Sequence, residues 1–82
     1  MSAVASAEFE ALIPSLVSEE REVEVCRAMH HVPGIEAVAT TIGAIWIGFR
    51  PEEISRKEIC RKLRGAGFPP EVALEDGAMV EC

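Results

Sequence analysis

The sequence predicts an α+β domain in which an antiparallel sheet packs against two helices. Apolar and polar residues alternate at Glu8–Ile13 and Ile45–Phe49, as they do in half-buried strands. Apolar residues recur at spacings of three and four after Ser18 and after Ser55, as they do in amphipathic helices. The order is strand, helix, strand, strand, helix, strand. Right-handed crossovers then favour a four-stranded antiparallel sheet with both helices on one face, the ferredoxin-like βαββαβ arrangement.

The first half of the predicted domain is one strand and one helix. Phe9, Ala11 and Ile13 point to one side of the strand, and Pro14 cannot donate to a ladder, so pairing should stop there. Ser18 followed by acidic residues is typical of a helix N-terminus. The helix should run to about residue 31, before Pro33 and Gly34. Its apolar stripe consists of Val25, Ala28, Met29 and Val32.

The second half is a hairpin, a helix and a last strand. The second strand is predicted from Ile35 through Ile42, with a reversal at Gly43-Ala44 before the third strand. Ser55 and Glu58 have the capping-box spacing at a helix start. The apolar face of that helix consists of Ile59, Cys60 and Leu63, and the last strand is Glu71–Glu75. We therefore expect a lead-in at residues 1–7, a domain at 8–75, and a tail at 76–82 that is frayed or a short edge strand.

Composition excludes several function classes. The chain has 82 residues and a formal net charge of −6, which disfavours nucleic acids and anionic membranes because both are bound largely through Lys and Arg. No apolar run approaches the ~20 residues that span a bilayer, and no signal-peptide pattern begins the chain. A soluble, cytoplasmic protein is the expectation.

The cysteines are few and widely spaced. Three thiols, at Cys26, Cys60 and Cys82, are too scattered for a disulfide framework, and their odd number leaves at least one free. We expect reduced thiols in a reducing compartment. Cys60 is expected to be a small buried apolar residue, and Cys82 an incidental thiol at the chain end.

Two segments resemble a known family. VPGIEAV, from Val32, resembles the Leu-Pro-Gly-Val-x-x-Val at the end of the first helix in the heavy-metal-associated domains of soluble copper and zinc chaperones and metal-pumping ATPases. GFRPEEISRKEICRKLRGAGF, ending at Phe68, resembles the strand, turn, helix and Ala-Gly-Tyr that close those domains. The resemblance implies the ferredoxin-like fold and a metal-trafficking background. It also implies that Phe68 shields the loop before the first helix.

The family's metal motif is missing. Without a gap, Gly-Met-x-Cys-x-x-Cys falls on Ser15–Arg21, so Ser18 and Arg21 stand where the two thiols would be, and Leu16 keeps the apolar side chain of the Met. A hydroxyl is a poor ligand for a soft ion, and a guanidinium stays protonated and repels cations. The usual site is therefore predicted to be absent.

The first helix offers a different candidate metal site. Glu22, Cys26 and His30 are four residues apart and share one face, so a carboxylate, a thiol and an imidazole could bind Zn or Cu. A water or a second subunit would supply the fourth ligand, and His31 is a further candidate. The alternative is an exposed polar face with an incidental cysteine. No other cofactor is indicated.

The open face of the sheet is a candidate docking surface. The alternation that turns Ile45 and Ile47 to the helices sends Trp46 to the other face, together with Leu12. A protein partner or a second copy in a homodimer could cover this patch; alternatively the tail 77–80 folds over it. The charges also segregate, with acids on the first helix and bases on the second. Such complementary patches can guide docking. The alternative is that both are simply helix faces exposed to solvent.

Two function classes remain. The sequence contains no Asn, which the acylphosphatases of the same topology require beside an Arg, and no Gly-rich phosphate loop, so we expect no enzymatic activity. The first class is a metal-binding or metal-handling domain with its usual thiol pair replaced. The second is a metal-free interaction or regulatory module. A small-molecule sensor of the amino-acid-binding type shares the topology, but no residue here indicates its ligand.

Overall fold

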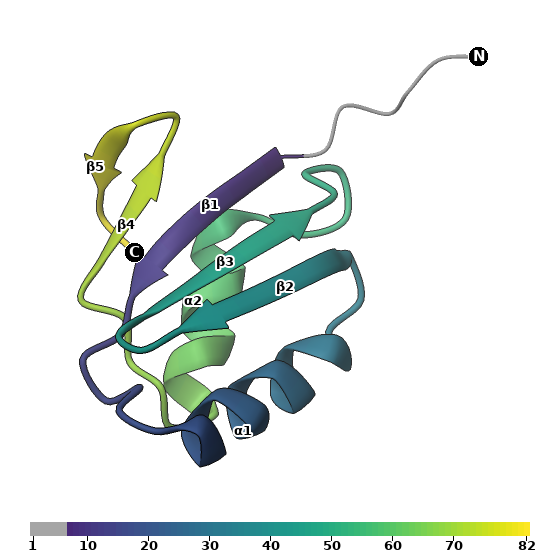
Figure 1. Cartoon of the computed structure of the whole chain (residues 1–82). Coiled ribbons are helices and arrows are strands. Elements are labelled where there is room, and N and C mark those ends of the chain that lie inside the picture. Colours follow the sequence, from purple (N-terminus) through teal and green to yellow (C-terminus); the bar gives the residue numbers. More distant parts are fainter. Residues whose placement is uncertain (1–6) are drawn as a thin grey trace.

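The structure is a computed structural model that describes residues 7–82 (Figure 1). Five strands and two helices follow one another along the chain. They are β1 (Ala7–Leu12), α1 (Glu19–His30), β2 (Ile35–Thr41), β3 (Ala44–Phe49), α2 (Arg56–Gly65), β4 (Val72–Glu75) and β5 (Ala78–Val80). Ala7 already belongs to β1, and the rest of the predicted lead-in, residues 1–6, lies outside the described residues.

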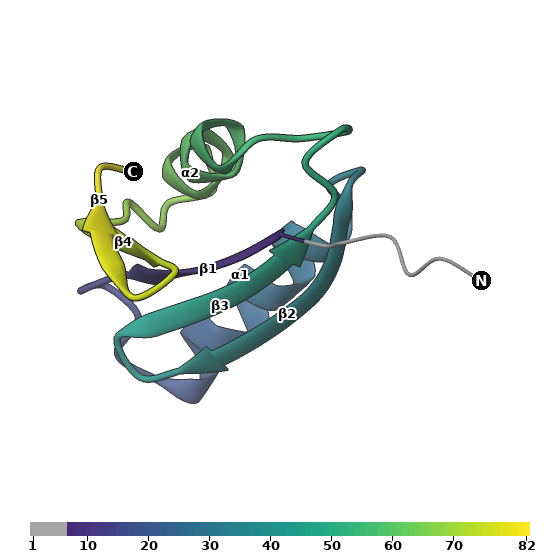
Figure 2. The ribbon, with the colours of Figure 1, turned by 90° about the horizontal axis from the view of Figure 1, so that it is seen from above.

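The strands form one antiparallel sheet in the order β2-β3-β1-β4-β5. The predicted α+β, ferredoxin-like arrangement is confirmed, with five strands in place of four. Figure 2 shows α2 lying across one side of the sheet, and Figure 1 shows α1 running beside β2. Since β2 and β5 are the two edges, α1 lies next to an edge strand.

The core fills the space between the sheet and the helices. Alternate residues of the central strands are buried, and Phe9 and Phe49 meet edge to face with ring centroids 5.8 Å apart. Val25 and Met29 of α1 are buried, as the stripe predicted. The fully buried large side chains are Phe9, Ile13, Leu16, Met29, Ile45, Ile47, Ile59, Leu63, Val25 and Cys60.

Both helices begin as the sequence predicted. The Ser18 hydroxyl accepts a hydrogen bond from the backbone N–H of Arg21 at 3.3 Å. The Ser55 hydroxyl accepts from the N–H of Glu58 at 3.2 Å and donates to its carboxylate at 3.3 Å. These bonds satisfy N–H groups that have no partner inside the helix.

The tail forms a strand because a tight turn precedes it. Asp76 and Gly77 both have positive φ, 53° and 79°, as the two central residues of a type I′ turn do. Asp-Gly is a strong hairpin signal, so β5 folds back on β4 and pairs through Ala73 with Val80 and Leu74 with Met79. The β2–β3 turn is Ile42-Gly43, which leaves Ile42 out of the strand and exposed.

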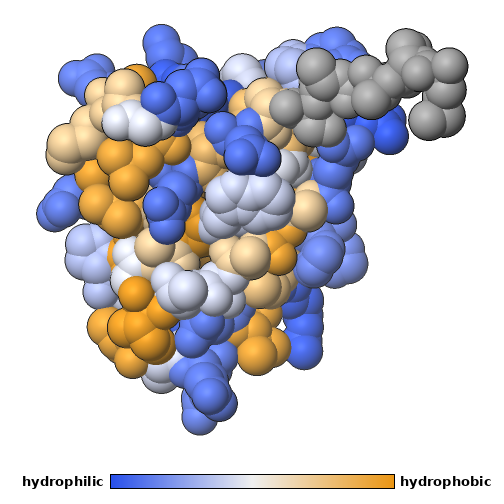
Figure 3. All heavy atoms as spheres, turned by 45° about the horizontal axis from the view of Figure 1, so that its top comes forward, coloured by the Kyte–Doolittle hydropathy of each residue, from blue (hydrophilic) through white to orange (hydrophobic). Residues whose placement is uncertain are grey.

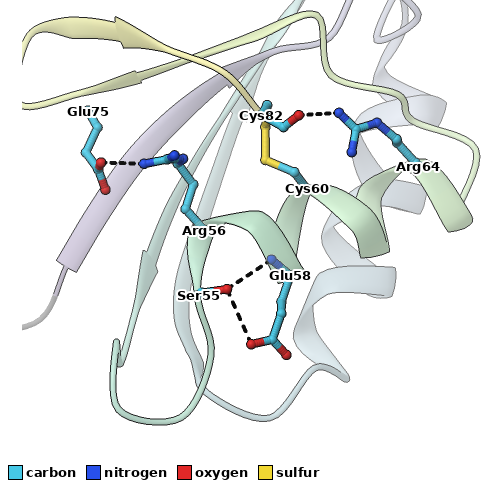
Figure 4. Close-up of a disulfide and its surroundings, with 7 residues drawn as sticks. All are labelled: Ser55, Arg56, Glu58, Cys60, Arg64, Glu75 and Cys82. Carbon is cyan, nitrogen blue, oxygen red and sulfur yellow. Dashed lines mark hydrogen bonds and ion pairs between the residues drawn. A yellow bond between two sulfur atoms is a disulfide. The ribbon is translucent and has the colours of Figure 1, made fainter.

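The prediction of reduced thiols is wrong for two of the three cysteines. Cys60 is bonded to Cys82, and only Cys26 is free (Figure 4). Sequence spacing could not show that β5 brings the last residue back to α2. Cys60 is buried as expected, but as half of a disulfide. Arg64 donates to the carbonyl of Cys82, and Arg56 pairs with Glu75 at 2.6 Å, so α2 holds the last hairpin.

The disulfide removes the cysteine-based argument for a reducing compartment. Within residues 7–82, neither helix is long and apolar enough to cross a membrane. The cytoplasmic location therefore stays a prediction.

Candidate functional site

The loop between β1 and α1 is an ordinary helix start. Ser18 caps α1, Leu16 is fully buried beneath the loop, and the Leu16 carbonyl accepts from the N–H of Gly43 at 2.8 Å. The hydroxyl that stands in place of the family's first thiol is thus engaged in capping.

Arg21, in place of the second thiol, packs on Phe68. Its guanidinium carbon lies 5.1 Å from the centre of the Phe68 ring, and a terminal nitrogen lies 3.4 Å from the Glu24 carboxylate. Phe68, which follows α2, is buried and lies beneath the Arg21 guanidinium, while its shielding of the loop stays a prediction. Because a positive side chain occupies this place, a metal ion here would meet a fixed charge of the same sign.

Replacing Arg21 tests this packing. We expect Arg21→Ala to lower the free energy of unfolding by about 0.5–1 kcal/mol, the usual size of an exposed cation–π contact. Urea unfolding followed by circular dichroism measures it. Glu24→Gln is the matched control, since it removes only the ion pair. Equal stability of Arg21→Ala and the unaltered chain would contradict the contact.

A groove of about 620 Å³ separates α1 from the edge strand β2. Its walls are Glu19, Glu22, Val23, Cys26, Arg27, His30, His31 and Thr40. The Cys26 thiol is half-buried and donates to the Thr40 hydroxyl across 3.9 Å, and that hydroxyl donates to the Glu22 carboxylate across 2.8 Å. Thr40 therefore bridges two of the predicted ligands.

The three predicted metal ligands line the same groove but do not converge on one point. Eight residues of helix span ~12 Å from Glu22 to His30, and side chains lean toward the helix N-terminus. The Thr40 hydroxyl holds the Glu22 carboxylate near Cys26, whereas His30 lies one turn further along α1. Within residues 7–82 no three His, Cys, Asp or Glu side chains are placed to hold an ion together as they stand. The three-ligand set stays a prediction.

Trp46 and Leu12 lie on the face of the sheet opposite the helices. The Trp46 side chain is 36% exposed, and Leu12 is half-buried. The tail does not fold over Trp46, because residues 78–80 pair with β4 at the sheet edge. A second hollow, about 330 Å³, lies beside the ring and is lined by Glu8, Phe9, Glu10, Trp46, Leu74, Asp76 and Gly77.

Sequence reasoning missed Thr40 and Asp76. Thr40 faces the helix from β2, and its alternation with exposed Ala39 and Thr41 was the available signal. Asp76 was signalled by the Asp-Gly pair, which places it at the turn beside the Trp46 hollow.

Comparisons with known proteins define the class of fold. No protein-family profile and no curated protein sequence matches the chain. Among solved structures, the chain is similar to oxidized MerP from Ralstonia metallidurans CH34, with a TM-score of 0.75 and 19% identity over 82% of this chain and 96% of that one. At this identity the likeness shows a shared fold. The chain is therefore a domain with the fold of MerP.

Proposed function

We propose that this chain is a non-catalytic domain of the heavy-metal-associated type that binds a transition-metal ion through Cys26 and His30. One observation carries the proposal: the one free thiol among the described cysteines lies half-buried in the groove between α1 and β2, one helical turn before an exposed imidazole. Residues four apart on a helix have their Cβ atoms ~6 Å apart, which suits two ligands of the same ion.

The ligand types favour zinc over copper. Zinc accepts thiolate, imidazole and carboxylate together, whereas Cu(I) prefers sulfur. Glu22, held by Thr40 beside Cys26, is the third ligand in this proposal, and a water or a group from a second copy is the fourth. Binding requires Cys26 to lose its proton, so zinc affinity should rise with pH.

Zinc retention tests the proposal. The oxidised chain has a single thiol outside the disulfide, so it is loaded with Zn(II) without reductant and dialysed against a chelator of about micromolar affinity. We expect about one zinc per chain in the unaltered protein and none in Cys26→Ala or His30→Ala.

Glu20→Gln is the matched control, because it removes a carboxylate of α1 that does not line the groove. Equal metal content in Cys26→Ala and the unaltered chain would place the ion elsewhere and refute the assignment. No zinc in any sample would also refute it.

The second candidate is a metal-free interaction module. Two observations favour it: Ser18 and Arg21 are engaged in capping and packing, and Trp46 is exposed on the sheet face away from the helices. Binding of a protein without metal retention would select this candidate.

A further inference from the structure

The indole of Trp46 leans along β3 on the open face of the sheet. A methyl group built on Gly48 would come 3.3 Å from Cη2 and 3.7 Å from Cζ2 of the ring, so this edge of the indole covers Gly48. Gly48 is buried for this reason, although it belongs to the open face. Trp46 itself remains 36% exposed.

Carboxylates lie along the side of this ring that faces β1. Glu10 is the direct cross-strand partner of Trp46, and Glu8 is that of Gly48, so both stand on β1 beside the indole. Leu74 is opposite Glu10 on β4, and the turn beyond it brings Asp76 to the same hollow. Figure 3 shows this surface obliquely, with apolar residues over the strands and hydrophilic residues among them.

These carboxylates are not neutralised within the molecule. Among residues 7–82, no side-chain hydrogen bond or ion pair engages the carboxylates of Glu8, Glu10 and Asp76. By contrast, Arg56 pairs with Glu75 at the back of the same strand β4. Three like charges around an aromatic face produce a negative potential directly over the negative face of the ring.

We propose that this hollow binds a lysine or arginine side chain presented by a basic segment of a partner protein. The cation sits over the Trp46 ring, and Glu8, Glu10 and Asp76 provide its counter-charges. Aromatic rings attract cations most strongly when the ring is Trp. The hollow, about 330 Å³, is large enough for one such side chain with its apolar stem against Leu74.

Charge complementarity selects this occupant. The chain has a net charge of −6, so an anionic partner would be repelled, and an apolar one would leave the carboxylates without compensation. A second copy would have to use the basic face of α2, which lies on the opposite side of the sheet. Such a head-to-tail contact does not close into a dimer, so we assign the hollow to a different protein.

This inference supplies a partner for the metal-free candidate and does not depend on the groove at Cys26. Both tests can be run on one preparation, because peptide binding is measured with chelator present. Loss of metal binding in Cys26→Ala and loss of peptide binding at Trp46 are then separate results.

The experiment uses the single Trp of the chain as a reporter. A short oligolysine or oligoarginine peptide is titrated while Trp46 emission is followed, and an oligoglutamine peptide of equal length is the control. We expect the basic peptides to change the emission with saturation and to bind more weakly as salt rises, and the glutamine peptide to have no effect.

Variants locate the contact, with a dye-labelled peptide as the probe. We expect Trp46→Leu to weaken binding about 3- to 30-fold, and Glu10→Gln about 2- to 5-fold. Glu52→Gln, an exposed acid outside the hollow, should leave affinity unchanged.

Three results would overturn the proposal. One is equal binding of the glutamine peptide. Another is equal weakening by Glu52→Gln and Glu10→Gln, which would mean attraction to net charge alone. The third is self-association in sedimentation that disappears in Trp46→Leu, which would make a second copy the occupant.

Discussion

Opening the Cys60–Cys82 disulfide is expected to lower the free energy of unfolding by about 3 kcal/mol. The bridge joins residues that are 22 apart in the sequence. Closing a loop of that length lowers the conformational entropy of the unfolded chain and so stabilises the folded one. For a domain of this size the change corresponds to a fall of about 12 to 24 °C in Tm.

The disulfide also holds β5 in place in the folded state. Val80 and Cys82 pack against the core, and β5 pairs with only one strand. Without the bridge, three ladder pairs, the packing of Val80 and the Arg64 contact hold the tail, so β5 should fray more readily and leave β4 as the sheet edge.

Thermal unfolding of Cys82→Ser tests this expectation, since the last residue can change without opening a cavity at Cys60. Cys26→Ser is the matched control and should unfold close to the unaltered chain. If Cys82→Ser and the control have equal Tm values, the disulfide does not contribute as described.

Introducing two thiols at the start of α1 is expected to create a Cu(I) site. Ser18→Cys with Arg21→Cys places two soft ligands at the positions that the family resemblance gives for its thiols, and it removes the cationic guanidinium from Phe68. We expect about one Cu(I) per chain at this loop, resistant to a competing Cu(I) chelator.

A Cys26→Ser background isolates the new thiols from the natural one. The control is Ser18→Ala with Arg21→Ala in the same background, which removes the cap and the guanidinium without adding sulfur. No difference in Cu(I) retention between the two double variants would mean that the loop geometry no longer suits metal.

The interior of this fold follows from local sequence rules. Alternation placed Phe9, Ile45 and Ile47 in the core, and Ser18 and Ser55 marked both helix starts. Sequence patterns allow either a frayed tail or a fifth strand at residues 76–82, and the Asp76-Gly77 pair, which signals a hairpin, favours the strand. The disulfide depends on that hairpin, because pairing of distant thiols is decided by where the chain returns in space.

The candidate site was predictable only in part. Helical periodicity put Glu22, Cys26 and His30 on one face, and the structure places that face along a groove. Alternation along β2 could turn Thr40 toward the helices, but no local pattern could pair its hydroxyl with Glu22 and Cys26 on α1. Likewise, strand alternation predicts that Trp46 is exposed. The positions of the carboxylates beside it depend on the register of β1 and β4, which no local pattern gives.

We propose that metal binding, which the family resemblance places in the β1–α1 loop, lies instead at Cys26 in this chain. Titrating the disulfide-intact chain with Co(II) tests this directly, because a thiolate ligand produces a charge-transfer absorption band. We predict a band that saturates at about one Co(II) per chain and disappears in Cys26→Ser. A band of equal intensity in Cys26→Ser, or no band in the unaltered chain, would contradict the claim.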